Sequence, residues 1–370
     1  MNRIGLIYVD GHNFPNLALM RISAYHKSQG DVVEWWDGWE RYQRVYKSKV
    51  FSETYSHDDY DPVNCDELIK GGTGYCIQTI NGREIYDREK DKVLPAEIEQ
   101  MKPDYSIYPQ YDFAISMTTR GCPRGCPWCH VAAKEGRASV KVADVDRFYD
   151  GQQSIEVLDP NILACRDRED LLEQYADTGA EINYNQGLDI RLMTDTVMEI
   201  LTRTKLKNLH FAWDNPKDDL KEQFARWASI RGGRVADHGT KNGTVYVLTN
   251  FNSTMEENLH RIYTLRDLGY APYVMVYDKP NAPQEIKKLQ RWCNNRRIFF
   301  SKLGRDITAG EIVHDLRKLD APNIVRCIDC AKFIENGLPK QGICTSRIGF
   351  VPIDGFCEKG ERREDDRQAD

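Results

Sequence analysis

The chain has 370 residues and carries 51 Lys and Arg against 57 Asp and Glu, which gives a formal net charge of -6. This acidic balance argues against a protein whose whole surface binds nucleic acid, although it does not exclude local basic patches. No run of about 18 apolar residues is present, and the opening residues, MNRIGLIYVDGHN, do not read as a signal peptide. We therefore expect a cytoplasmic protein without membrane contact, with two or three domains.

Eleven cysteines are a high count for a cytoplasmic chain. Seven of them fall into two tight groups, and clustered thiols in a reducing compartment indicate metal binding and not disulfides. The scattered ones are expected to be inert core residues, namely Cys65, Cys76, Cys165 and Cys293. The two groups are therefore the candidate metal sites.

Residues 1–105 are predicted to form a small Rossmann-like α/β domain with a parallel sheet. The runs RIGLIYVD, DVVEWW and RVYKSKVF are candidate strands. Between the first two lies NLALMRISAYHKSQG, whose apolar spacing predicts a helix with Gly30 as its carboxyl-terminal cap. The turn GGTGY at 71–75 is expected where the backbone closely approaches another chain segment or a ligand.

Residues 106–321 show a repeated pattern of strands and helices. The candidate strands are DFAISMTTR, SIEVLDPN, EINYNQGLDIRL, NLHFAWDN, TVYVLTNF and PYVMVYDK. Helical patterns separate several of them, which predicts a parallel sheet rolled into a partial (β/α)6 barrel of the TIM type. Ligands of such barrels bind at the carboxyl ends of the strands.

A loop with three cysteines follows the first of these strands. The stretch TTRGCPRGCPWCHV holds Cys122, Cys126 and Cys129, and its glycines and prolines keep it out of regular structure. Iron–sulfur cubes and zinc sites usually take four protein ligands. Three thiolates on a four-iron cluster leave one iron open to a chelating ligand. The alternative is a zinc site with His130 as fourth ligand, but a direct neighbour of Cys129 cannot easily complete the same tetrahedron.

The spacing C-x3-C-x-aromatic-C before a six-stranded βα series resembles the radical S-adenosylmethionine superfamily, over roughly residues 108–305. The resemblance implies that the three cysteines bind a 4Fe–4S cluster and that Trp128 lies near the adenine of S-adenosylmethionine. It also implies reductive cleavage of this cofactor, with an electron donor such as flavodoxin or ferredoxin, to a 5′-deoxyadenosyl radical that attacks an unidentified substrate. No catalytic residue for quenching the product radical can be named.

Other strand ends supply further candidate contacts to S-adenosylmethionine. Where the family commonly has a Gly-Gly-Glu turn, this chain has LDPN, so Asp159 and Asn161 are expected to replace it. In NQGLDIRL, Gln186 is a candidate contact, and Arg191 could pair with the methionine carboxylate or with Asp189. Later strands end in further polar or aromatic candidates: Trp213, Asp214, Asn250 and Asp278.

The order of the domains resembles the radical S-adenosylmethionine subgroup with an amino-terminal cobalamin-binding-like domain. Cobalamin is therefore an alternative cofactor, and a cobalamin-dependent methyltransferase an alternative function. Asp10-Gly11-His12 is similar to the Asp-x-His-x-x-Gly loop of some cobalamin domains, but Pro15 replaces its glycine. About 100 residues are short for a complete cobalamin cradle, which favours a domain that shapes the substrate channel. The other interpretation of His12 is a helix-start residue bonded to backbone.

Methylthiotransferases also place an α/β domain before the barrel, and that domain supplies three further cysteines for a second cluster. Only Cys65 and Cys76 are available here, which makes this assignment weak. A function of another class also stays open, namely a nucleic-acid-binding or regulatory metalloprotein with an inactive barrel. The intact three-cysteine loop argues against it.

The second cysteine group lies in residues 322–358 and has the spacing C-x2-C-x13-C-x12-C. Its members are Cys327, Cys330, Cys344 and Cys357. Four thiolates predict a small module that depends on structural zinc or, as an alternative, on a second iron–sulfur cluster. The charged stretch at 359–370 is expected to be a disordered tail.

Overall fold

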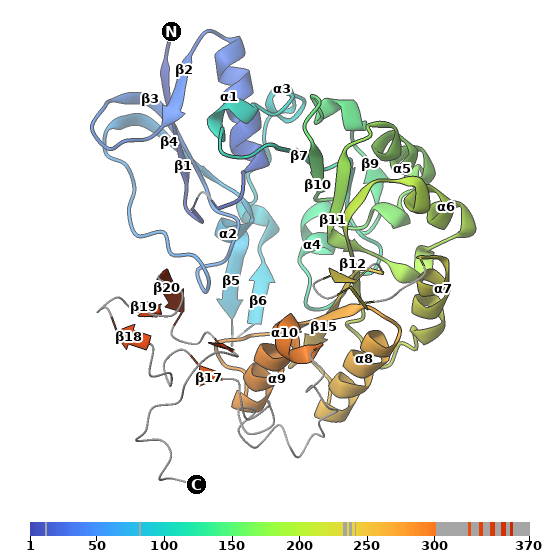
Figure 1. Ribbon diagram of the computed structural model, residues 1–370. Coiled ribbons are helices and arrows are strands. Elements are labelled where there is room, and N and C mark those ends of the chain that lie inside the picture. Colours follow the sequence, from blue (N-terminus) through green and yellow to red (C-terminus); the bar gives the residue numbers. More distant parts are fainter. Residues whose placement is uncertain are drawn as a thin grey trace. The chain divides into compact units, whose positions relative to one another are not determined.

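The computed structural model describes residues 1–11, 13–80, 83–231 and 242–300, together with short strands near 235–240 and between 325 and 357 (Figure 1). Contacts divide the chain into two compact units, residues 1–248 with 264–272 and residues 249–263 with 273–370. The predicted boundary at 105–106 falls inside the first unit. No helix in the described ranges is both long and apolar enough to cross a membrane.

The first unit begins with a four-stranded parallel sheet in the order β2-β1-β3-β4. Its strands are β1 (Arg3–Tyr8), β2 (Val32–Trp35), β3 (Tyr42–Ser48) and β4 (Cys65–Gly71). The first three strands lie where the sequence predicted them. Strand β4 was not predicted because its sequence, CDELIKG, pairs two acidic residues with two apolar ones and lacks the alternation of a half-buried strand. The two exposed acidic positions suit an edge strand.

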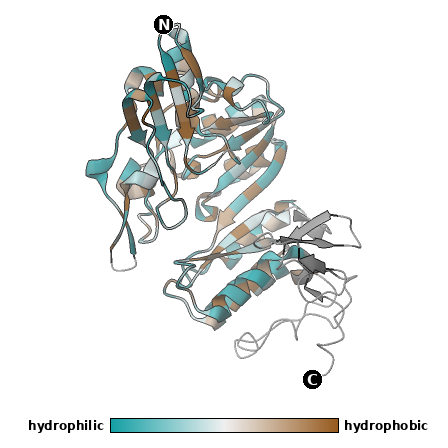
Figure 2. Cartoon of the chain, turned by 90° about the vertical axis from the view of Figure 1, so that its left-hand side faces the viewer, coloured by the Kyte–Doolittle hydropathy of each residue, from teal (hydrophilic) through white to brown (hydrophobic). Residues whose placement is uncertain are grey.

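Helix α1 (Leu17–Ser28) joins β1 to β2 and supplies the core of this part. Asn16 caps its first turn, with its side-chain oxygen accepting from the Leu19 N–H at 3.1 Å. Gly30 follows the helix with φ +81°, as its predicted capping role requires. The buried face of α1 packs in one apolar cluster with β1, β3 and Ile115. Figure 2 shows the hydrophobic strands of this sheet near the amino terminus.

The glycine-rich turn at 71–75 packs against a chain segment. The Gly74 N–H donates to the Lys49 carbonyl at 2.9 Å, and a Cβ atom at Gly74 would overlap the carbonyl oxygen of Phe51. Of the two expectations for this turn, close approach to the segment after β3 is the one observed. Helix α2 (Thr73–Cys76) starts inside the turn.

Short elements lead from α2 to the second sheet. They are β5 (Ile77–Ile80), β6 (Arg83–Tyr86), α3 (Ala96–Glu99) and two 3-10 turns, Arg88–Lys90 and Tyr105–Ile107. Strands β5 and β6 form an antiparallel hairpin. The sequence alone did not predict these elements because each spans only three or four residues, too few to show a period.

The second sheet has six parallel strands in the order β7-β10-β11-β12-β15-β16, which is also their order along the chain. The strands are β7 (Phe113–Ser116), β10 (Ser154–Val157), β11 (Glu181–Leu188), β12 (Leu206–Ala212), β15 (Thr244–Thr249) and β16 (Ala271–Val276). The predicted mixed α/β class with a parallel sheet is confirmed. Among the described residues no strand closes the sheet into a barrel.

Helices lie between consecutive strands of this sheet, as expected for parallel crossovers. They are α4 (Val131–Glu135), α5 (Arg168–Asp177), α6 (Asp195–Arg203), α7 (Lys221–Arg231) and α8 (Met255–Asp267). Three short 3-10 turns accompany them, Val145–Arg147, Ile162–Ala164 and Ile190–Leu192. The hydroxyls of Ser116 on β7 and Tyr175 on α5 are 2.7 Å apart, and Phe211 on β12 packs edge-on against Phe224 on α7. These contacts identify the face of the sheet that the helices cover.

The second unit contains α9 (Gln284–Asn294) and α10 (Arg296–Phe299). The side chain of Asn294 accepts from the Val274 N–H at 2.7 Å and so holds α9 against β16. Small antiparallel ladders follow, made of β17 (Val325–Arg326), β18 (Phe333–Glu335), β19 (Gln341–Cys344), β20 (Gly349–Pro352) and β21 (Phe356–Cys357). In the first unit, a further short pair, β13 (Val235–Ala236) and β14 (Gly239–Thr240), precedes β15.

Two of the four carboxyl-terminal cysteines have a described backbone. Cys344 ends β19 and Cys357 ends β21. Cys327, Cys330 and the predicted tail at 359–370 lie outside the described residues, as does His12. The zinc or second-cluster prediction therefore stays a prediction.

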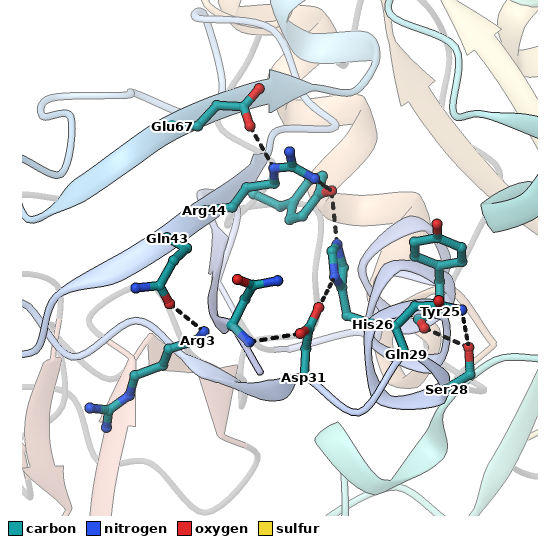
Figure 3. A network of polar contacts seen from close by, with 11 residues as sticks. Arg3, Tyr25, His26, Ser28, Gln29, Asp31, Gln43, Arg44 and Glu67 are labelled. Carbon is teal, nitrogen blue, oxygen red and sulfur yellow. Dashed lines mark hydrogen bonds and ion pairs between the residues drawn. The ribbon is translucent and has the colours of Figure 1, made fainter.

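A chain of polar contacts ties the end of α1 to the first sheet (Figure 3). The buried His26 ring places Nδ1 2.9 Å from Asp31 Oδ2 and Nε2 3.0 Å from the Tyr46 hydroxyl. Arg44 donates to the same hydroxyl at 3.3 Å and to Glu67 on β4 at 2.6 Å. The chain of contacts thus connects α1, β3 and β4.

Replacement of Asp31 by Asn tests this network. The Asn2 N–H, which donates at 2.8 Å, and then His26 keep the pKa of Asp31 below its usual range. The carboxylate therefore contributes stability above about pH 4, and the contribution is lost as pH falls through the lower folded-state pKa. We expect Asp31→Asn to lower the free energy of unfolding by about 1–3 kcal/mol at pH 7 in urea titrations.

The control is Asp59→Asn, because Asp59 is exposed and its replacement should change stability by less than about 0.5 kcal/mol. The difference between wild type and Asp31→Asn should shrink at pH 3. A difference of the same size at both pH values would contradict the role given to the carboxylate.

Candidate functional site

The three-cysteine loop begins at the carboxyl end of β7. The short strands β8 (Thr119–Arg120) and β9 (Val140–Lys141) pair antiparallel and close the loop at its base. Inside it, the Cys122 N–H donates to the Gly136 carbonyl at 3.1 Å, and the Cys129 N–H donates to the Cys126 carbonyl at 3.0 Å. The loop is therefore held by backbone hydrogen bonds although it has no regular structure.

Gly121 is required where the chain enters this loop. Its φ is +85°, and a Cβ atom there would overlap the carbonyl oxygen of Ala138. Its N–H donates to Glu135 at 3.2 Å. Only glycine allows the strand to turn so close to the returning segment, and this turn places Cys122 beside the end of β10.

The three thiols influence one another electrostatically. Burial raises the pKa of Cys126, and Cys129, Asp214 and Cys122 act in the same direction. The pKa of Cys129, the most exposed residue of the three, is also raised, by burial of its thiol and then by Cys122, Asp214 and Glu135. The thiols of Cys126 and Cys129 are therefore both in surroundings that disfavour the thiolate.

The loop does not present the coordination shell of a single metal ion. Within the described ranges, no three His, Cys, Asp or Glu side chains are arranged to hold one ion. His130 lies beside the β5–β6 hairpin, with Nε2 3.8 Å from Glu84 and its ring next to Tyr86.

Asp159 anchors the strand end from which the loop starts. Its two oxygens accept four hydrogen bonds, from the N–H groups of Thr118 at 3.1 Å and Thr119 at 2.5 Å and from both hydroxyls at 2.7 Å. Burial raises the pKa of Asp159 to about 6 and outweighs these hydrogen bonds, which act in the opposite direction. All four bonds come from the two residues that open the loop, so Asp159 positions the loop.

Asn161 lies next to the first cysteine. Its Nδ2 is 3.5 Å from Cys122 Sγ and donates to it, while its backbone carbonyl accepts from the Ser139 hydroxyl at 2.9 Å. The residue is only 4% exposed, and its Oδ1 has no hydrogen-bond partner among the described residues. A buried acceptor without a partner is costly in free energy, which marks Oδ1 as an atom that a ligand could satisfy.

The charged residues after β11 pair with each other. Arg191 donates to Asp189 at 2.6 Å and to Asp218 at 2.7 Å, which is the internal pairing that the sequence left open. The second oxygen of Asp189 lies 3.4 Å from Arg124 Nε, an ion pair that reaches the cysteine loop. Gln186 is exposed near the end of β11. In this arrangement Asp189 and Arg191 support the loop.

The remaining candidates occupy different surroundings. Trp128 is half-buried on the loop. Trp213 belongs to the core, where its N–H donates to the Asp218 carbonyl at 2.8 Å and its ring stacks on Phe224. In the second unit, Asn250 donates to the Tyr277 carbonyl at 2.8 Å, and Asp278 bonds to Asn281.

A polar cluster that the sequence did not predict lies on the face of the sheet opposite the helices. Glu156 on β10 is 5% exposed and accepts from Asn183 at 2.6 Å and from Asn185. Its other oxygen lies 3.5 Å from the ammonium group of Lys207 on β12. In the register of β10 and β11, Glu156 is paired with Asn183, whereas Tyr184 is on the helix-covered face beside Tyr175.

The same face continues onto the next strands. His210 on β12 stacks on Tyr246 of β15 with ring centroids 5.3 Å apart, and the Tyr246 hydroxyl donates to the Asn185 carbonyl at 3.3 Å. Asn183 is 8% exposed, and its Oδ1 has no hydrogen-bond partner in the described part of the chain. The sequence contained a signal for this cluster. A strand that is buried on both faces is normally apolar throughout, so the Glu in SIEV and the Asn residues in EINYN indicated a polar face.

The comparisons with known proteins do not identify the chain. No family model matches it, and no curated protein matches it. Among solved structures, it is similar to the solution structure of the carboxyl-terminal part of RcsC from E. coli, which contains a linker region and a phosphoreceiver domain. The sequences are 13% identical, the match covers 80% of this chain and 93% of that one, and the TM-score is 0.19. A likeness at this TM-score carries no argument about fold or function.

Replacement of Asp159 by Asn tests the anchor of the loop. Because the folded-state pKa of about 6 exceeds the unfolded value of about 3.9, the stability contribution of Asp159 is present below pH 4 and is lost as pH rises through about 6. Asn lacks this titration, and its NH2 group cannot accept from the threonine N–H groups. We expect Asp159→Asn to lose about 1–3 kcal/mol at pH 5 and to remove the decline between pH 4 and 6.

Urea unfolding at pH 4, 5, 6 and 7 measures both effects. Thr119→Ser is the matched control, since it keeps the backbone and hydroxyl donors to Asp159. An unchanged pH profile in Asp159→Asn would show that another group titrates in this range.

Proposed function

We propose that the protein is a radical S-adenosylmethionine enzyme, in which the six-stranded sheet forms a partial (β/α)6 barrel and the amino-terminal four-stranded sheet belongs to a Rossmann-like domain. One observation carries the proposal. The loop that carries Cys122, Cys126 and Cys129 follows the first strand of the sheet, at its carboxyl end, where a buried Asn161 amide donates to Cys122 Sγ at 3.5 Å. Ligands of parallel α/β sheets bind at this edge.

The three thiolates would hold a 4Fe–4S cluster and leave one iron for the amino and carboxylate groups of S-adenosylmethionine. When bound there, this cluster would supply the electron that breaks the sulfonium C–S bond to give methionine and a 5′-deoxyadenosyl radical. An electron donor of the flavodoxin or ferredoxin class would replace that electron. The radical would take a hydrogen atom from the substrate, which leaves 5′-deoxyadenosine and a substrate radical.

The surrounding residues support this chemistry by position and charge. Asn161 Oδ1 is a buried acceptor suited to the methionine amino group, while Asp159 and the Arg124–Asp189 ion pair hold the loop. The methionine carboxylate is left without an assigned partner, because Arg191 is engaged by two aspartates. Trp128 on the loop stays the candidate for the adenine.

The polar face of the sheet is the part suited to the substrate. Glu156 is fixed by two asparagine amides, Lys207 has a 43% exposed side chain, and Asn183 Oδ1 lacks a partner among the described residues. A buried carboxylate in the middle of a sheet costs free energy, so its retention favours a functional role. Its acceptors would orient a substrate that carries N–H or O–H donors.

Two parts of the proposal concern further cofactors. In the described part of the amino-terminal four-stranded sheet, only one long helix, α1, accompanies the strands. This favours a domain that shapes the substrate channel and disfavours a complete cobalamin cradle. Cobalamin would show itself in the visible spectrum of anaerobically purified protein. The carboxyl-terminal cysteines would hold structural zinc or, alternatively, a second iron–sulfur cluster.

The cysteine loop is tested by anaerobic reconstitution with iron and sulfide, followed by dithionite and S-adenosylmethionine. We expect 5′-deoxyadenosine from the wild type, and at least a hundredfold less from Cys122→Ala, which should also lose most of the cluster iron. Cys65→Ala is the matched control, since Cys65 is a lone, half-buried thiol in β4. Cleavage retained in Cys122→Ala would contradict the proposal.

The carboxyl-terminal site is tested by metal analysis of Cys327→Ala and Cys330→Ala. Each variant should lose one zinc per chain, or the iron of one cluster, because three remaining thiolates bind a structural metal weakly. The visible spectrum of the first cluster should not change. Metal content equal to that of the wild type would contradict a site in this segment.

A further inference from the structure

A cavity of about 450 Å³ lies in the amino-terminal sheet, apart from the cysteine loop in sequence. It is lined by Asp10, Phe51, Tyr55 and Ser56. Asp10 follows β1, and the other three follow β3. Its volume is within the range of sites for small organic ligands.

The position of this cavity is the one that topology favours for a ligand. In the order β2-β1-β3-β4, the chain adds β2 on one side of β1 and β3 on the other. The connections after β1 and β3 therefore leave the sheet in opposite directions, which opens a crevice at the carboxyl ends of these strands. The cavity and the reversal of strand order are independent observations, and both indicate a ligand site at the carboxyl ends of β1 and β3.

The walls of the crevice are aromatic. Phe51 and Tyr55 are each 56% exposed, which is unusual for two large apolar side chains that line one concavity. The N–H groups of Tyr55 and Ser56 both donate to the Ser52 carbonyl, at 3.0 and 2.9 Å, so a turn fixes this wall. Exposed rings on an ordered turn suit a flat ligand that stacks on them.

The polar group of the crevice is an acceptor. Asp10 accepts from the N–H of Val50 at 2.6 Å and from the N–H of Phe51 at 3.2 Å, through different oxygens. The two bonds hold the carboxylate in place and leave each oxygen with a further lone pair. A ligand here must therefore supply N–H or O–H donors.

The surroundings disfavour a phosphate group. The start of α1, where nucleotide-binding sheets usually hold phosphate, is capped by Asn16, whose amide also donates to the Ser48 hydroxyl at 2.9 Å. Lys49 is 2% exposed and already paired with Glu53. The negative charge of Asp10 would repel an anion in the cavity.

We propose that this crevice binds a neutral nucleoside, with its base stacked on Phe51 and Tyr55 and its N–H or hydroxyl donors directed to Asp10. None of the four lining residues belongs to the cysteine loop, and the proposal does not depend on radical chemistry. Stacking on the two rings and hydrogen bonds from the ligand to Asp10 would give the affinity. Phosphorylated forms would bind more weakly because the Asp10 carboxylate repels their negative charge.

Calorimetric titration of the full chain with guanosine tests the proposal, because guanosine carries both base-edge and ribose donors. Guanosine should bind saturably, and guanosine monophosphate should bind at least about tenfold more weakly. Tyr55→Ala and Phe51→Ala should each weaken guanosine binding about five- to thirtyfold. Asp10→Ala should weaken it about tenfold or more.

The matched control is Trp39→Ala, since Trp39 is an 88% exposed aromatic residue that does not line the cavity. It should bind guanosine as the wild type does. Thermal melting of each variant would separate lost binding from lost folding. Absence of saturable guanosine binding, equal or tighter binding of the monophosphate, or unchanged binding in Tyr55→Ala would each overturn the proposal.

Discussion

The hydrogen bonds between Asp159 and the two threonines that follow β7 are the contacts on which the cysteine loop depends. They join the ends of two neighbouring parallel strands, β7 and β10, directly before the chain leaves the sheet. The carboxylate is buried at a cost that raises its pKa to about 6, and four donors offset that cost. Such a fully satisfied buried group fixes the direction in which the loop starts, whereas a solvated loop base would leave the thiols poorly placed.

Asn161, two residues further along, shows the complementary situation. Its amide N–H group contacts Cys122, but its oxygen lacks a partner among the described residues. One short segment after β10 thus carries a saturated residue that holds the loop and an unsatisfied residue that could contact a ligand. The same division occurs on the polar face of the sheet, where Glu156 is held by two amides and Asn183 Oδ1 has no described partner.

The two candidate sites of the first unit differ in their electrostatics. At the cysteine loop, Arg124 lies between the first two cysteines and contacts Asp189, so cationic and anionic groups are both close to the proposed ligands. In the amino-terminal crevice the described lining has one carboxylate and two exposed aromatic rings, with Lys49 paired elsewhere. The first arrangement suits a charged cofactor, and the second suits a neutral one.

Much of the fold followed from the sequence alone, because local patterns are sufficient for it. The apolar runs predicted six parallel strands, and the helical spacing after Asn16 predicted α1. The C-x3-C-x2-C spacing likewise marked the loop, since its glycines and prolines disfavour regular structure. The edge strand β4 was missed because exposed charges interrupt its pattern.

Tertiary structure decided which polar residues are free to act. The sequence could not show that Asp159 is saturated by Thr118 and Thr119, or that Arg191 is engaged by Asp189 and Asp218. Nor could it bring Glu156, Asn183 and Lys207 together, because they belong to three strands and meet only through the register of the sheet. Residue type sets what a side chain can donate or accept, but pairing between distant segments determines which of those capacities are left for a ligand.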